Sequence, residues 1–158
     1  MHISFNIYNE SLRNKLKGKS EDDILANSKD LSSFGKMEKG CQYGILFLVK
    51  QSIEEGLEHF NLSFGFELAA AYGHLEIIKY LLNNTSLNPN SLSLIYASDN
   101  GHLNVVKFLI KDDRIDPSAD NNHALRRSIE NGYKDIRRLL LKNNDFLPFL
   151  ECQIHHRS

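Results

Sequence analysis

The chain has 158 residues, 41% of them hydrophobic, and a formal net charge of −1, values typical of one soluble unit. This balance of charge gives no indication of nucleic-acid binding. No run of about eighteen apolar residues is present and the first residues do not resemble a secretory signal, so the sequence predicts neither a membrane span nor secretion. We therefore expect the cytoplasm or nucleus, with Cys41 and Cys152 as free thiols.

The first part of the chain, residues 1–33, contains no repeated motif. Ser20 precedes three acidic residues, which is the pattern of a helix N-cap followed by an acidic first turn. We expect one or two capping helices in this segment.

From residue 44 onwards a glycine recurs and is followed each time by similar apolar and basic residues. The glycines are Gly44, Gly73, Gly101 and Gly132, at spacings of 29, 28 and 31 residues. A constant period in this range is the signature of a repeat array. In Gly101-His-Leu-Asn-Val-Val-Lys-Phe-Leu-Ile110 the apolar residues lie two, four, five, eight and nine positions after the glycine, which is one face of a helix.

A second regularity precedes each glycine. A larger residue lies seven positions before it and a small one four before it, and these residues are Met37, Phe66, Leu94 and Leu125, and Gly40, Ala69, Ala97 and Ser128. This pattern predicts a first helix that ends at the glycine in a left-handed cap conformation. Pro89 and Pro117 mark turns between repeats, and Ser91 and Asn122 lie where an N-cap of the next first helix is expected.

These motifs resemble the ankyrin repeat, with its paired alanines, G-H dipeptide and apolar second helix, over roughly residues 35–145. The resemblance assigns structural turn positions to Gly44, Gly73, His74, Gly101, His102 and Gly132, and it implies that each histidine ring bonds the backbone of a neighbouring loop. The asparagine-rich stretch 116–125 resembles divergent repeats common in amoebae and in giant DNA viruses. No copy contains T-P-L-H and the period is shorter than the usual value of about 33, so we expect short finger loops.

The predicted fold is therefore an all-α, ankyrin-like solenoid of about four helix-turn-helix repeats with atypical ends. The expected parts are 1–33, 34–57, 58–86, 87–114, 115–145 and 146–158. Lys134 and Arg137 replace apolar residues of the earlier copies, as expected where an array closes. Phe146-Leu-Pro-Phe-Leu150 is an apolar patch in the tail, interpreted as a lid on the last repeat and as the route by which an otherwise monomeric chain would self-associate.

The resemblance implies a protein partner bound in the concave groove by the finger loops and the exposed face of the first helices. The candidate contact residues are Tyr43, Tyr72, Asp99, Asn100, Asp120, Glu130 and Asn131. Tyrosines are favoured at interfaces because they bury a large area at low entropic cost, and the acids would steer a basic partner segment. An alternative is that Tyr43 and Tyr72 only pack on adjacent loops.

The basic residues six positions after each glycine form a predicted column, namely Lys50, Lys79, Lys107 and Arg138. They would meet an acidic partner or phosphates, or they are simply solvated positions on an amphipathic helix.

Two other functions remain open. One is an adaptor that holds a client in the groove and docks on a larger assembly, such as a ubiquitin ligase, through residues 1–33 or 146–154. The other is a small metal protein or enzyme that uses His123, Cys152, His155 and His156. The sequence contains none of the common phosphate-loop, hydrolase or zinc-protease motifs, so we predict no enzyme activity, no cofactor and no metal site.

Overall fold

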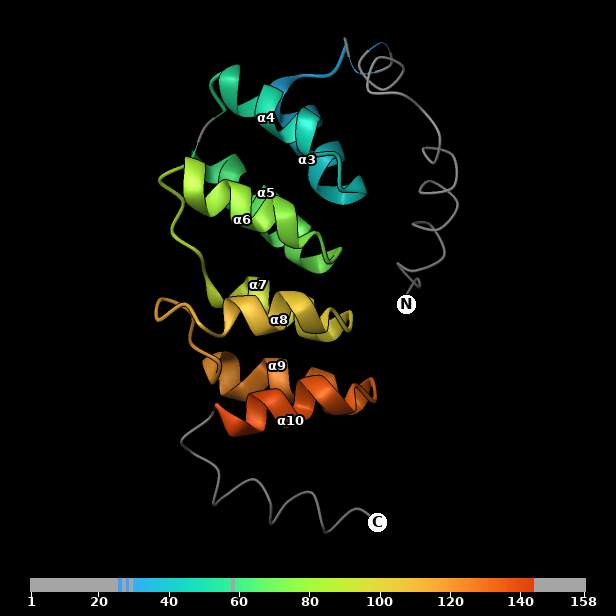
Figure 1. Ribbon diagram of the computed structural model, residues 1–158, viewed down its shortest axis with the longest axis vertical. Helices are drawn as coiled ribbons and strands as arrows, with labels where there is room; N and C mark the ends of the chain where they lie inside the picture. The colour runs from blue at the N-terminus through green and yellow to red at the C-terminus, as the bar shows by residue number, and fades with distance from the viewer. Residues whose placement is uncertain (1–25, 27, 29, 58, 144–158) are drawn as a thin grey trace. The chain divides into compact units, whose positions relative to one another are not determined.

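The computed structural model (Figure 1) describes residues 26, 28, 30–57 and 59–143. Within these residues all regular structure is helical, with eight α-helices and no strand, so the predicted all-α class is confirmed. No helix of this part of the chain has the length and apolar character needed to cross a bilayer. The chain forms two compact units, Met1–Leu87 and Asn88–Ser158, and each is described by itself.

The first unit contains two helix pairs. They are α3 (Ser33–Tyr43) with α4 (Leu46–Glu54), and α5 (His59–Ala71) with α6 (Leu75–Asn84). The first helices of the pairs, α3 and α5, pack on each other, and the second helices, α4 and α6, are also in contact. The unit therefore has a layer of first helices and a layer of second helices.

The second unit repeats this arrangement. Its pairs are α7 (Ser91–Asp99) with α8 (Leu103–Leu109), and α9 (Ala119–Glu130) with α10 (Lys134–Lys142). Here α7 contacts α9 and α8 contacts α10, while each first helix packs on its own second helix. Figure 1 labels the two helix pairs of each unit.

The turn inside every pair is closed in the same way. The residue that directly follows the glycine donates its backbone N–H to the carbonyl of the small residue four positions before the glycine, at 2.8–2.9 Å. The donor and acceptor pairs are Ile45 and Gly40, His74 and Ala69, His102 and Ala97, and Tyr133 and Ser128. All four glycines have φ between 75° and 78°, as predicted for the left-handed cap. The sequence regularity is thus a regularity of backbone hydrogen bonding.

The predicted large positions form the core. Met37, Phe66, Leu94 and Leu125 are at most 1% exposed. In the second helices the residues four and eight positions after the glycine are buried, and the residue five after it is buried in the first three copies. In the last copy that residue is Arg137, which is exposed.

One buried group was not predicted. Lys36 of α3 is 6% exposed and forms an ion pair with Glu55, which also accepts a bond from Ser33 Oγ at 3.0 Å. The bond from the Lys36 ammonium lowers the pKa of the Glu55 carboxyl, and the bond from Ser33 acts in the same direction. The pair satisfies a buried lysine between α3 and the end of α4.

The N-caps differ from the prediction. Ser91 is not the cap of α7: Asn90 Oδ1 accepts from the N–H groups of Leu92 and Ser93, whereas Ser91 Oγ accepts from the backbone of Asp116 at 3.0 Å. Asn122 has φ of 59° and belongs to a left-handed turn with Asp120 and Asn121, so its backbone lacks the extended conformation of an N-cap. Asn and Asp tolerate this region better than most residues.

Candidate functional site

The exposed large apolar side chains of the described residues all lie on first helices. In the first unit they are Phe34 of α3 and Phe64 of α5, 40% and 36% exposed, whose rings stack with centroids 5.6 Å apart. In the second unit they are Leu92 and Tyr96, 41% and 39% exposed, which lie four residues apart on one face of α7. Each unit therefore carries an apolar patch on its first-helix layer.

The two predicted tyrosines differ in exposure. Tyr43 is half-buried at the end of α3, and Lys39 Nζ lies 5.6 Å from its ring centroid. Tyr72 is only 8% exposed, and its hydroxyl accepts from Gln42 Nε2 at 3.4 Å. Tyr72 therefore links the ends of α5 and α3 and offers little surface to another molecule.

Three predicted residues of the second unit are gathered by Arg127, which sequence reasoning missed. Arg127 Nε donates to Asp99 Oδ1 at 2.6 Å, and Arg127 Nη1 donates to Glu130 Oε2 at 2.8 Å. Asn131 Nδ2 donates to the Asp99 carbonyl at 2.8 Å and to Oδ1 at 2.9 Å. The bond to Asp99, with a smaller effect of Glu130, raises the pKa of Arg127. This network joins the C-terminal ends of α7 and α9.

The remaining predicted contacts are turned toward their own helices. Asn100 Nδ2 donates to the Tyr96 carbonyl at 2.9 Å. Asp120 is exposed; its carbonyl accepts from Arg126 at 3.1 Å, and its carboxylate lies 3.7 Å from His123 Nδ1. Neither residue is part of the Arg127 network.

The predicted basic column is mostly occupied by local partners. Lys50 Nζ lies 5.4 Å from the ring centroid of Tyr80, Lys79 pairs with Glu76 at 2.8 Å, and Arg138 pairs with Asp135 at 3.2 Å. Lys107 is exposed and has no ion-pair partner within the described ranges.

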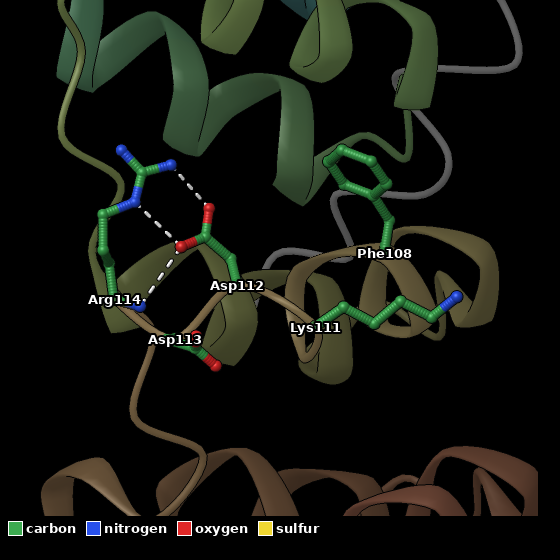
Figure 2. Close-up of a pocket in the computed structure, with 5 residues that line it drawn as sticks. All are labelled: Phe108, Lys111, Asp112, Asp113 and Arg114. Atoms are coloured by element: carbon green, nitrogen blue, oxygen red, sulfur yellow. Dashed lines mark hydrogen bonds and ion pairs between the residues drawn. The ribbon is translucent and has the colours of Figure 1, made fainter.

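A shallow hollow of about 460 Å³ follows α8, lined by Phe108, Lys111, Asp112, Asp113 and Arg114. Figure 2 shows the Arg114 guanidinium folded onto Asp112, with bonds of 2.8 and 2.6 Å. The bond from Arg114 lowers the pKa of Asp112. The Asp112 and Arg114 charges of the hollow are thus neutralised by each other.

The family is decided by a comparison over more than half of the chain. A family model of ankyrin repeats, in three copies, matches residues 66–148. The chain belongs to the ankyrin repeat family. No curated protein matches the chain. Ankyrin repeats generally mediate protein–protein interaction and are typically not enzymes, and the suggested viral or amoebal source stays a prediction.

His74 makes a contact of the kind that the resemblance implies for the ankyrin histidine. Its Nε2 lies 3.2 Å from the Gln42 carbonyl, 32 residues earlier, and its ring lies over Gly44, where a Cβ would approach within 2.7 Å. Tyr133 takes the same position in the last repeat and lies over Gly101, where a Cβ would approach its ring within 2.6 Å. The residue after the glycine of one ankyrin repeat therefore packs on the glycine of the preceding repeat in both units.

The metal hypothesis receives no support from the part of the ankyrin array that the structure describes, where no group of three His, Cys, Asp or Glu side chains is placed to hold an ion. Of its four proposed ligands, only His123 lies there. Cys152, His155, His156 and the expected lid lie outside the described residues, as do Ser20 and most of the expected N-terminal cap. Cys41 is a buried free thiol, and burial raises its pKa.

Proposed function

We propose that this ankyrin repeat protein binds a partner protein through the exposed face of its first helices, the face that lines the concave groove in this family. The supporting observation is that Phe34, Phe64, Leu92 and Tyr96 are all on first helices, whereas the described second helices expose no comparable side chain. Exposed apolar and aromatic side chains that gather on one face are typical of interaction sites, and aromatic residues are frequent anchors there.

The polar edge of this surface consists of residues near the C-terminal ends of the first helices and in the first turn of α9. They are Tyr43, Asp99, Asn100, Asp120, Glu130 and Asn131. In this proposal Tyr72 acts below the surface, since it holds Gln42 rather than contacting the partner. The helices are formed before binding, so the partner meets a rigid surface and little ordering cost is incurred.

The test compares proteins captured from a cell lysate by the full chain and by two variants. Leu92→Ser with Tyr96→Ser removes the apolar patch of α7, and because both side chains are exposed we expect a loss of folding stability below about 1 kcal/mol. Phe108→Ser on α8 is the control, since it removes an aromatic side chain from a second helix of the same unit.

The expected result is that specific captured proteins disappear with the α7 variant and remain with the control. Purified partner should then bind the α7 variant at least about 30-fold more weakly, the effect of losing roughly 2 kcal/mol at a hot spot. Capture by the α7 variant at the wild-type level, or equal loss with both variants, would count against the first-helix face of this unit.

A further inference from the structure

The last helix of the described chain has a strongly basic exposed face. Lys134, Arg137, Arg138 and Lys142 of α10 are all exposed, and Asp135 is the only acid of the helix. Asp135 pairs with Arg138. At 100° per residue the four basic residues lie within one side of the helix, while Ile136 and Leu140 on the other side are at most 2% exposed.

Closing the array explains why this face is polar, but not why it is basic. Ile78 and Val106, at the position of Arg137 in the two preceding copies, are fully buried. Any polar residue would end the stack, whereas α10 places like charges four residues apart, at 134 and 138 and again at 138 and 142, which destabilises a helix. Lys134 is also at the first helical position, where the helix dipole disfavours a positive charge. An anionic partner would offset both costs.

The surroundings limit what that partner can be. Apart from α10, residues 88–143 contain six acidic and five basic side chains. The basic face is therefore confined to one helix of nine residues, which is about 13 Å long. A long polyanion such as a nucleic-acid duplex would extend past the face onto surface that has no excess of positive charge. A lipid bilayer would gain no apolar insertion, because the apolar side of α10 is buried in the repeat.

We propose that the basic face of α10 is a second binding surface, which takes a short Asp/Glu-rich segment of a partner protein. Two of the four groups are guanidinium groups, which bind carboxylates through paired hydrogen bonds. This surface lies on the second-helix layer and does not depend on the proposed first-helix surface. It shares only Arg138 with the predicted basic column, and since Arg138 pairs with Asp135, the proposal depends mainly on Lys134, Arg137 and Lys142.

The experiment measures fluorescence anisotropy of a labelled peptide of about ten residues with a central Asp/Glu run, titrated with the full chain. The test variant is Lys134→Glu with Arg137→Glu. The matched control is Lys107→Glu with Lys111→Glu, which makes the same change of charge at two exposed positions of the same unit. Lys134→Gln with Arg137→Gln repeats the test without charge reversal, and circular dichroism checks that each variant is folded.

We expect the Glu variant of α10 to weaken binding at least tenfold, the Gln variant at least threefold and the control less than threefold. The Leu92→Ser, Tyr96→Ser variant should bind the peptide like the wild type, which separates this proposal from the first-helix surface. A peptide with Asn and Gln in place of the acids should not bind. The proposal is overturned if the acidic and amide peptides bind equally, or if the α10 and control variants weaken binding equally. It is also overturned if a DNA duplex or phosphatidylserine vesicles bind α10 more tightly than the peptide.

Discussion

Gly101 and Gly132 provide a direct test of how neighbouring repeats are held together. Both have left-handed backbone, with φ of 78° and 75°. A Cβ at Gly101 would lie 2.6 Å from Cε1 and 2.7 Å from Cζ of Tyr133, whereas a Cβ at Gly132 would meet no heavy atom within 4 Å. Alanine therefore introduces the same backbone strain at both positions, but only at Gly101 does it also meet the ring.

The expected magnitudes follow from these two contributions. A residue with a Cβ in the left-handed region costs about 1–2 kcal/mol, and the lower entropy of the unfolded chain offsets part of this. We therefore expect Gly132→Ala to lower the free energy of unfolding by about 1 kcal/mol. Gly101→Ala should cost a further 1–3 kcal/mol or so, since a planar ring must shift as a whole to make room.

The assay is urea unfolding of the full chain, followed by circular dichroism. Gly101→Ala, Gly132→Ala, Tyr133→Ala and the double variant Gly101→Ala, Tyr133→Ala are compared with the wild type. The excess cost at Gly101 should largely disappear when Tyr133 is already alanine. Equal costs at the two glycines, or an excess that survives removal of the ring, would refute the view that Tyr133 packs on the preceding turn.

Further predictions concern the core, a cap, a thiol and pH. Leu94→Ala should lower the free energy of unfolding by about 2–5 kcal/mol in the same urea assay, because Leu94 is fully buried. Asn90→Ala should cost about 1 kcal/mol through loss of the N-cap of α7, and replacement by Ser should recover most of it. Cys41 should resist alkylation in native protein, as tested by mass spectrometry, and react after unfolding. The bond from Lys36 lowers the pKa of Glu55 in the folded protein. The ion pair therefore stabilises the fold fully above pH 4.5, the ordinary pKa of a glutamate, and this stabilisation is lost as the pH falls through the lower pKa of the folded state. Glu55→Gln should therefore reduce the fall of the melting temperature in acid.

The elements of each repeat could be predicted because they depend on short-range chemistry. The turn of each repeat needs a residue with positive φ, which is the glycine. The carbonyl four positions before the glycine accepts the hydrogen bond that closes the turn. Glycine and a small residue therefore recur in the sequence at a fixed distance from each other. The cap of α7 was placed one residue late because Asn90 and Ser91 are adjacent and both are good caps. Sequence alone does not reveal that Ser91 Oγ receives the backbone N–H of Asp116, 25 residues away.

The predicted contact surface was less accessible to sequence reasoning because it depends on pairs between repeats. Arg127 lies five residues before Gly132, and Asp99 lies two residues before Gly101 of the preceding repeat. Because the two positions differ within their repeats, their contact depends on how α9 packs along α7. The Lys36 pair lies within one repeat, but it also joins two helices, because its partner Glu55 follows α4. The exposed residues Phe64 and Leu92 both lie nine positions before their glycines, but Gly35 and His123 hold that position in the other two copies, so the repeat pattern alone does not mark it as an exposed apolar site.

The balance between the apolar patches and the acids determines what kind of partner the first-helix surface would select. Arg127 donates to both Asp99 and Glu130, so the three groups together carry one uncompensated negative charge. An exposed ion pair between this negative charge and a basic group of the partner would contribute about 0–1 kcal/mol to binding. Salt would screen the attraction of the partner by this charge beyond about 10 Å. Burying the exposed two fifths of Leu92 would contribute about 1 kcal/mol by area, and Tyr96, Phe34 and Phe64 are exposed to a similar extent. Within the second unit Leu92 and Tyr96 together therefore outweigh the acids, and a partner of this patch would be selected mainly by the spacing of its own apolar side chains.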